Sequence, residues 1–386
     1  MKKNNPEINP ALNLIAPLKV LIAPLDWGLG HTTRIIPIIY ECLEAGCEVV
    51  LAGNNAQKAL LTAEFPNLTF LNLPGYDVKY SQHHRFFMWK LLLQLPQLQS
   101  TINKEHKWLH KIVNEHKPQL IISDNRYGLY HQKVRSIFIT HQLNIHSPFG
   151  KMVDRVIQKL HYRLIEKFNA CWIADQQENG LGGELSHPVI KPVIPIFYTG
   201  WLSRFNKDAT EKKEKHLLVM LSGPEPQRTI FEKKIFSELK YLREQVIVVR
   251  GLPGNNETLN LDAHVKVYNH VPANELNKLM LEASFVIGRC GYSTVMDLAR
   301  LKKKSILVPT PGQTEQEYLA RFLSSQRFTY SMNQQDFSLI KCIEHAKHFN
   351  YLFPTEIPGQ LNELVDLTIK TFVTQKVTVD SSIGQL

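Results

Sequence analysis

A histidine directly behind two glycines is the first feature with chemical content. Gly28-Leu29-Gly30-His31 follows the apolar run 19–25 and precedes a helical pattern over 32–45. Glycine lets a backbone approach a ligand closely, and a helix N-terminus exposes unpaired N–H groups. A neutral imidazole is the side chain best suited to accept a proton near pH 7. The pattern predicts a general base at His31, or a histidine that packs locally at a helix start.

An aspartate ends another apolar run. Asp124 comes directly after residues 120–123. Because the carboxyl ends of parallel strands meet at one edge of a sheet, Asp124 should face the same side as the His31 turn. A carboxylate that accepts an imidazole N–H fixes the tautomer and stabilises the imidazolium. We predict a pair of His31 with Asp124, and the competing interpretation is an aspartate that caps a turn or helix.

A tight turn and a helix start are combined in residues 288–298, Gly-Arg-Cys-Gly-Tyr-Ser-Thr-Val-Met-Asp-Leu. Backbone N–H groups and hydroxyls at the positive end of a helix bind phosphate. An aspartate one turn into the helix, here Asp297, has the oxygens to accept hydrogen bonds from two ribose hydroxyls. A second interpretation is a capping box of Thr294 and Asp297, and both interpretations can hold together.

Amide and carboxylate side chains cluster in residues 309–318. Gln313, Gln316 and Glu317 present paired donors and acceptors that suit sugar hydroxyls. Taken alone, the segment predicts only a loop followed by a capped helix.

Several site classes lack their motifs. The chain has no phosphate-binding P-loop pattern, and Thr33 stands where a dinucleotide fingerprint has its third glycine. It contains no Asp-x-Asp pair, so we expect no metal, and no cofactor. Its five cysteines are scattered, which argues against structural zinc. Aromatic residues are not interleaved with basic ones, so we expect no nucleic acid partner.

Length, composition and charge limit the class of protein and the kinds of partner. The chain has 386 residues, 44% of them hydrophobic, and a formal net charge of +10. This excludes a disordered or fibrous protein and indicates an anionic partner, for which the charge alone leaves nucleic acid, anionic lipid and phosphorylated small molecules open. The N-terminus lacks the continuous apolar centre of a signal peptide, and no apolar run reaches the roughly 18–20 residues of a membrane span. We expect a cytoplasmic protein, with a peripheral position on the inner face of the membrane left open.

Apolar runs alternate with helical patterns along the whole chain, which predicts an α/β fold of two Rossmann-like, doubly wound domains that face each other across a cleft. The expected strands are 19–25, 48–52, 68–73, 120–123, 137–140, 171–174, 216–221, 245–249, 265–268, 285–288 and 305–309. The expected domains are 1–204 and 216–350, joined by a charged linker over 205–215, with a tail over 351–386 that packs back on the first domain.

Together these motifs resemble the GT-B glycosyltransferases, and in particular the family that contains the peptidoglycan lipid-intermediate N-acetylglucosaminyltransferase, with its family 28 type C-terminal domain. The resemblance rests on residues 28–31, 288–297 and 309–318, and more weakly on 140–144 and 268–272. It covers most of the chain, from residue 19 to about residue 323. It departs from the family at 222–228, where prolines replace a glycine-rich turn.

The resemblance implies an inverting hexosyltransferase that needs no metal and moves a sugar from a nucleotide diphosphate, expected to be UDP, to an acceptor hydroxyl. The implied catalytic residues are His31 and Asp124. The donor-binding residues are expected to be Gly223, His270, Val271, Gly291, Tyr292, Ser293, Thr294, Asp297, Gln313, Gln316 and Glu317. Where the chain departs from the family, prolines remove backbone donors, and Arg228 is expected to grip the diphosphate instead. The implied acceptor-side residues are Gly28, Gly30, His141 and Asn144. A UDP-sugar 2-epimerase and a non-catalytic nucleotide-sugar-binding protein are the alternatives.

A basic stripe recurs at every fourth position of a predicted helix: Lys151, Arg155, Lys159, Arg163 and Lys167. Like charges at this spacing repel by about 0.2–0.5 kcal/mol per pair, so the pattern needs an explanation. One explanation is a solvated face, relieved by Asp154 and Glu166. The other is contact with an anionic membrane that presents a lipid-linked acceptor, aided by the apolar residues in 85–93.

Overall fold

The computed structural model describes residues 17–75, 95–147, 149–206, 214–252 and 261–383, together with residues 255, 257 and 259. The apolar segment 85–93 and most of the predicted linker lie outside the described residues.

The first sheet has seven parallel strands in the order β3-β2-β1-β4-β5-β6-β7. The strands are β1 Lys19–Pro24, β2 Glu48–Gly53, β3 Thr69–Asn72, β4 Leu120–Asp124, β5 Arg135–Thr140, β6 Ala170–Ile173 and β7 Ile196–Tyr198. The strand order reverses between β1 and β4, which is where doubly wound sheets bind ligands beyond their carboxyl ends.

The second sheet repeats this order with six parallel strands, β10-β9-β8-β11-β12-β13. They are β8 His216–Met220, β9 Val246–Val249, β10 Val265–Tyr268, β11 Ala283–Arg289, β12 Ser305–Val308 and β13 Tyr330–Ser331. Its order reverses between β8 and β11, the strands that precede Gly223 and Gly291. Each sheet is buried by helices, in agreement with the predicted α/β class of two Rossmann-like units.

Helices connect the strands of both sheets. Those of the first sheet are α1 Leu29–Arg34, α2 Ile36–Glu44, α3 Asn55–Glu64, α5 Leu95–His116, α6 Lys151–Ile165 and the short 3-10 helix Gly183–Leu185. Those of the second are α7 Gln227–Leu239, α8 Ala273–Leu281, α9 Tyr292–Leu301, α10 Thr314–Ser325 and α11 Leu339–His348. The final helix is α12 Gln360–Ile383.

Two local predictions were wrong. The helix expected over 32–45 is divided into α1 and α2, because Pro37 has no N–H to donate to the carbonyl of Thr33. The capping box of Thr294 and Asp297 does not form, because α9 begins earlier, with Gly291 as its N-cap and no side-chain cap. Both segments are still helical, so the errors affect helix boundaries rather than the order of elements.

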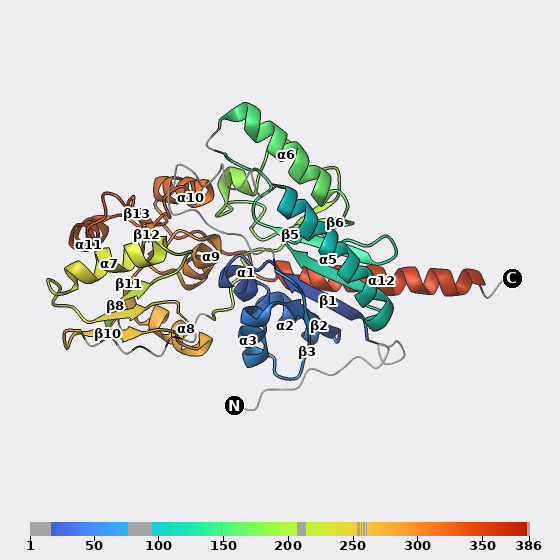
Figure 1. Cartoon of the computed structure of the whole chain (residues 1–386), viewed down its shortest axis with the longest axis horizontal. Coiled ribbons are helices and arrows are strands. Elements are labelled where there is room, and N and C mark those ends of the chain that lie inside the picture. The colour runs from blue at the N-terminus through green and yellow to red at the C-terminus, as the bar shows by residue number, and fades with distance from the viewer. Residues whose placement is uncertain are drawn as a thin grey trace.

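The two sheets and their helices lie side by side, and α1 packs against α9 where they meet (Figure 1). One buried apolar cluster runs through this seam, from Ile35 and Ile36 to Val295 and Met296. Helix α12 packs against α2 and β7 of the first sheet, although it follows the second sheet in sequence. The seam is thus part of the protein core, and it brings the turn after β1 next to the turn after β11.

Candidate active site

His31 and Asp124 are in direct contact, as the sequence predicted. Asp124 is the last residue of β4, and its register partner on β1 is Pro24, a few residues before His31. The Nδ1 atom of His31 lies 2.9 Å from Oδ2 of Asp124. The side chain of His31 is 16% exposed, whereas that of Asp124 is fully buried. The imidazole is therefore held from the inside of the protein and still reaches the surface.

This contact fixes the tautomer of His31. A carboxylate only accepts hydrogen bonds, so Nδ1–H is the donor and Nε2 carries the lone pair. Among the described residues, none forms a hydrogen bond with Nε2 of His31. The ring is thus arranged to accept a proton at Nε2, which is what a general base requires.

Arg34 is a site residue that the sequence analysis missed. Its Nε lies 3.1 and 3.0 Å from the two carboxylate oxygens of Asp124, and its NH2 group also donates to that carboxylate. Arg34 lies one helical turn after His31 and is buried. A single cation on the buried face of a predicted helix was the sequence signal that could have identified it. Asp124 therefore accepts hydrogen bonds from two donors, the imidazole of His31 and the buried guanidinium of Arg34.

Arg34 also sets the ionisation of the pair. Burial acts to raise the pKa of Asp124, but the charges of Arg34 and His31 outweigh it and hold the pKa at about 2. The pKa of His31 is lowered from its usual value, first by burial and then by Arg34, against the opposing effect of Asp124. His31 is consequently neutral near pH 7, with its lone pair available.

His141 lies between the first half of the protein, which is built on the first sheet, and the second half, which is built on the second sheet. Its Nδ1 is 2.8 Å from NH1 of Arg34, and its Nε2 is 2.8 Å from Oε1 of Glu315, on α10 of the second half. Its ring stacks on Tyr292 at the start of α9, with centroids 4.3 Å apart and planes 10° from parallel. The predicted acceptor-side histidine therefore contacts two residues of the predicted donor half.

The turn after β11 meets the turn after β1. Ser293 donates from Oγ to the carbonyl of Gly30, at 2.9 Å. Gly291 has open space where a side chain would stand, and the side chain of Thr294 is partly exposed. The N-terminus of α9 thus opens beside the turn that carries His31, where its free N–H groups favour an anion.

Asp297 lies deeper in the same helix. It is 9% exposed and accepts a hydrogen bond of 2.6 Å from Oγ of Ser203. Burial raises its pKa to about 7, although Ser203 and Arg204 oppose the shift. This carboxylate therefore changes charge close to neutral pH.

The three polar residues of segment 309–318 organise their own loop. Gln316 accepts from the backbone N–H of Thr310 at 2.9 Å, and Glu317 accepts from that of Gly312 at 2.8 Å. Gln316 in turn donates to Gln313 at 2.5 Å. The loop after β12 is therefore held in a defined shape.

The remaining predicted residues are spread more widely. Gly223, with φ of +98°, follows β8 beside Thr310. Gly28, with φ of +85°, caps α1, and Asn144 lies near the 3-10 helix, where its N–H donates to Leu185. His270 is exposed and Val271 is buried, both beyond the edge strand β10.

Arg228 is engaged by acidic neighbours. Its Nε lies 2.6 Å from Glu225 and its NH1 lies 2.5 Å from Glu232, while Glu232 also pairs with Arg250. The two carboxylates place negative charge beside this guanidinium, which opposes the approach of a phosphate. Its predicted role in gripping the diphosphate stays a prediction.

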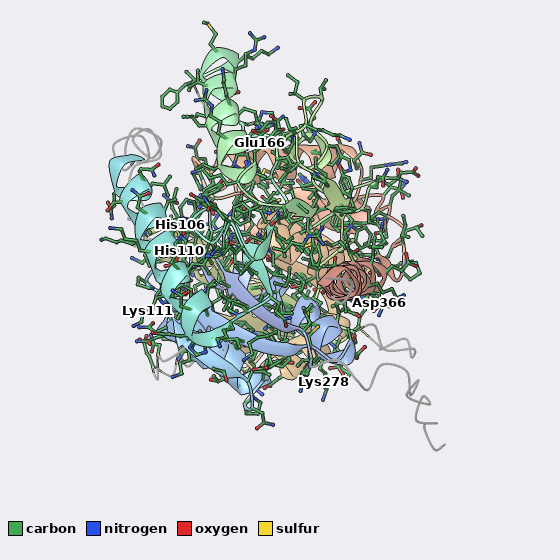
Figure 2. All side chains as sticks on the ribbon, turned by 90° about the vertical axis from the view of Figure 1, so that its right-hand side faces the viewer. His106, His110, Lys111, Glu166, Lys278 and Asp366 are labelled. Carbon is green, nitrogen blue, oxygen red and sulfur yellow. The ribbon has the colours of Figure 1, made fainter. Side chains whose placement is uncertain are left out.

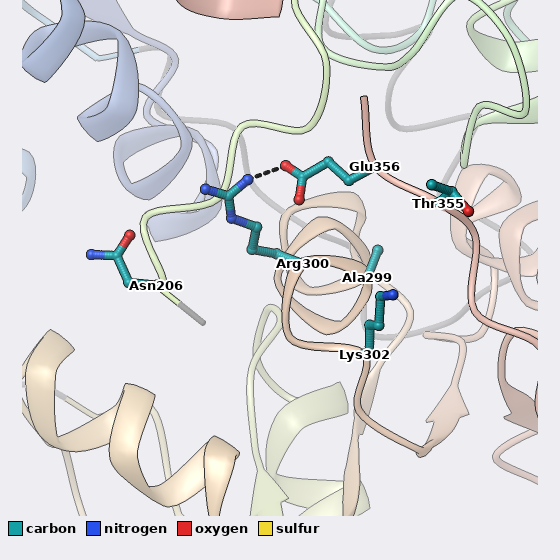
Figure 3. A pocket seen from close by; sticks show the side chains of 6 residues that line it. All are labelled: Asn206, Ala299, Arg300, Lys302, Thr355 and Glu356. Carbon is teal, nitrogen blue, oxygen red and sulfur yellow. Dashed lines mark hydrogen bonds and ion pairs between the residues drawn. The ribbon is translucent and has the colours of Figure 1, made fainter. Parts of the chain in front are cut away.

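A polar hollow of about 490 Å³ lies elsewhere, near the C-terminal end of α9 (Figure 3). It is lined by Asn206, Ala299, Arg300, Lys302, Thr355 and Glu356. Arg300 and Glu356 form an ion pair across it. None of the predicted site residues lines this hollow, and within the part of the chain that the structure describes no three side chains are grouped as metal ligands.

Helix α6 stands out from the body of the first half, with Glu166 at its end (Figure 2). All five residues of the basic stripe are exposed. Apolar side chains are exposed beside them, on α6 and on the loop that Tyr162 and Glu166 fasten to it. They are Met152, Val156, Leu160, Val189, Ile190 and Val193. In the described residues, no helix has the length and apolar character needed to cross a bilayer.

Sequence comparisons identify the class of enzyme. The sequence model of the glycosyltransferase family 28 C-terminal domain matches residues 225–355. The UDP-N-acetylglucosamine–N-acetylmuramyl-(pentapeptide) pyrophosphoryl-undecaprenol N-acetylglucosamine transferase of Clostridium perfringens is 24% identical over 366 residues. The match covers 89% of this chain and 95% of that enzyme.

Solved structures agree on the fold. The spinosyn rhamnosyltransferase SpnG in complex with thymidine diphosphate has a TM-score of 0.57 at 12% identity, covering 90% of this chain and 94% of that one. MurG of Acinetobacter baumannii has a TM-score of 0.52 at 11% identity, covering 92% and 100%. These similarities confirm the predicted arrangement of two Rossmann-like units in a GT-B fold.

Proposed function

We propose that this chain, a glycosyltransferase with a family 28 type C-terminal domain, moves a sugar from a UDP-sugar to an acceptor hydroxyl with inversion and without a metal. The observation that carries the proposal is the contact between the turn after β1 and the turn after β11. The His31–Asp124 pair stands at the strand-order reversal of one sheet, and Ser293 of the other half bonds to the same turn. A base and an anion-binding helix end are thus placed side by side.

In the proposed reaction, Nε2 of His31 takes the proton of the acceptor hydroxyl. The acceptor oxygen attacks the anomeric carbon from the face opposite the diphosphate, so the configuration inverts. The bond between that carbon and the diphosphate oxygen breaks, and its electron pair leaves with UDP. The N–H groups at the start of α9 stabilise the departing charge. This assignment needs no metal.

The donor is proposed to lie on the carboxyl edge of the second sheet. Gly223 and residues 291–294 approach the diphosphate, Asp297 accepts from the ribose hydroxyls, and the backbone at 270–271 contacts the base. Gln313, Gln316 and Glu317 face the sugar from the loop that they organise. The name of the Clostridium perfringens relative, a UDP-sugar transferase, supports UDP as the nucleotide.

A nucleotide panel tests the donor class. Ligands that bind only the folded state raise the melting temperature by mass action. We expect UDP to raise it and GDP and CDP to leave it unchanged, with the same result in the presence of EDTA. A UDP-sugar panel, followed by release of UDP with added acceptors, then identifies the sugar. Failure of every nucleotide diphosphate to bind would refute the proposal.

The pKa of Asp297 predicts a pH-dependent affinity for UDP. Ribose hydroxyls donate to a carboxylate better than to its acid, so affinity should rise as the pH passes upward through about 7. Asp297→Asn should weaken UDP binding about 10–100-fold at pH 8, the equivalent of about 1.5–3 kcal/mol for a hydrogen bond to a charged group. It should also remove the part of the pH dependence that Asp297 causes and leave only the part due to the UDP phosphate, which titrates at about pH 6. Calorimetry at pH 6, 7 and 8 measures both effects.

The control for this variant is Asp336→Asn, since Asp336 is exposed and outside the site. It should bind UDP as the unchanged protein does at each pH. Equal affinity of the Asp297 variant and the control at pH 8 would remove the ribose role.

The acceptor is proposed to be lipid-linked and presented at an anionic membrane surface. Exposed apolar side chains lie next to the basic stripe on α6, an arrangement that suits the boundary between lipid headgroups and acyl chains. The apolar loop 189–193 extends this surface beyond the residues that the sequence singled out. The name of the Clostridium perfringens relative, whose acceptor is a pyrophosphoryl-undecaprenol, agrees with the proposal.

Neutralising the stripe should release the protein from anionic vesicles. Each lysine or arginine near such a surface contributes about 1 kcal/mol of attraction, so five glutamine substitutions should reduce binding to phosphatidylglycerol vesicles by more than tenfold. Sedimentation with the vesicles measures the bound fraction. The control neutralises five exposed lysines of the second half, Lys233, Lys240, Lys278, Lys304 and Lys341. Unchanged sedimentation of the stripe variant would contradict a membrane role.

A further inference from the structure

We propose that Glu315, a residue of the second half, is a positioning residue for His31 and completes the charge arrangement around that base through His141 and Arg34. The base is then fully assembled only where the two halves are in contact. The inference rests on the proposed function, because it concerns the same base.

The contacts form one continuous chain across the seam. Asp124 joins His31 to Arg34, Arg34 donates to His141, and His141 contacts Glu315. Every side chain in this chain except that of Glu315 comes from the first half. Tyr292, also of the second half, stacks on the imidazole of His141 and keeps its ring plane fixed.

The protons in this chain have defined places. A guanidinium only donates, so Nδ1 of His141 is the acceptor for Arg34. The remaining proton of a neutral His141 is then on Nε2, and it is donated to the carboxylate of Glu315. Glu315 therefore selects the one tautomer of His141 that can also accept from Arg34.

Glu315 also changes the charge that faces His31. The charged and titratable groups around His31 are Arg34 on its own helix, Asp124 on β4, His141 after β5 and Glu315 on α10. Without Glu315, the charges of Arg34 and Asp124 cancel. With it, the group carries one net negative charge, which stabilises the imidazolium that forms when His31 accepts a proton.

The pKa of Glu315 agrees with this geometry. Burial acts to raise its pKa, but His141, His31 and Arg34 together lower it below the usual value. Glu315 is thus ionised at neutral pH. Because coupling between charges is mutual, a carboxylate stabilised by the charged form of His31 also increases the basicity of His31.

The test compares Glu315→Gln with Glu344→Gln, an exposed glutamate of the same half. Histidine labelled with ¹⁵N in the full chain reports the titration of each imidazole, and the His31 signal is assigned with His31→Asn. We expect Glu315→Gln to lower the pKa of His31 and the control to leave it unchanged. Glu315→Asp, which keeps the charge, should restore part of the difference.

Activity provides the second readout. With a UDP-sugar that the protein uses, Glu315→Gln should reduce kcat about threefold to tenfold, well below the 10²–10⁴-fold attributed to a general base, and shift the acidic limb of the pH profile downward. Affinity for UDP should be unchanged. An unchanged His31 titration in folded Glu315→Gln would overturn the inference, even with an active enzyme. Absence of transfer by the unsubstituted protein would instead refute the proposed function.

Discussion

Replacing His31 with alanine is expected to lower kcat by about 10²–10⁴-fold, the usual contribution of a general base. UDP affinity should be retained, because the donor is assigned to the opposite half. The fold should also be retained, since the side chain is 16% exposed and Asp124 keeps its ion pair with Arg34. The measurements are UDP release in the presence of acceptor and calorimetric titration with UDP.

A histidine far from the seam supplies the control for this variant. His348 is exposed in the last turn of α11, and His348→Ala should be fully active. Turnover by His31→Ala at the rate of this control would exclude His31 as the base. Loss of UDP binding together with turnover would indicate that the turn after β1 holds the donor instead.

Replacing Arg34 with methionine is expected to destabilise the protein by about 3–5 kcal/mol, the typical cost of leaving one member of a buried ion pair without its partner. Asp124 is fully buried and would retain only His31 as a donor. Chemical denaturation at pH 7 measures the loss in the free energy of unfolding. Arg34→Lys, which keeps the charge but not the bidentate contact, should lose less of the free energy of unfolding.

The pH dependence of stability separates this explanation from a simple packing defect. In the unsubstituted protein the pKa of Asp124 is about 2, below its unfolded value, so its stabilisation is present above about pH 4 and is lost as the pH falls through 2. In Arg34→Met the carboxylate has lost its guanidinium and favours protonation, so the loss in the free energy of unfolding should shrink as the pH is lowered. The double variant with Asp124→Asn should recover part of the loss at pH 7. A deficit that is equal at pH 5 and pH 8 would contradict the ion-pair explanation.

Most of the architecture could be predicted because parallel strands buried on both faces are continuous apolar runs. Residues 120–122 and 217–220 are such runs, and they lie in β4 and β8. The short edge strands β7 and β13 were missed, because three and two residues carry too little pattern. The contact of His31 with Asp124 was predictable, since topology alone places both at the same edge of one sheet.

The charge network was not predictable in the same way. Arg34 is an ordinary helical position in the sequence, and its role depends on the depth at which α1 meets the sheet. Glu315 is separated from His141 by 174 residues, and only the docking of the halves brings them together. The hydrogen bond from Ser203 to Asp297 corresponds to no pattern in the sequence. Such pairs depend on tertiary geometry that local pattern does not encode.

The continuous core at the seam limits how such enzymes can be recombined. An engineer who joins the first half of this chain to the second half of a homologue inherits α1 and His141 from one parent and α9 and α10 from the other. The apolar surfaces of α1 and α9 must then match, and the new partner of His141 must be an acceptor. Hybrids should therefore be chosen by these two seam conditions before any change of sugar specificity is attempted.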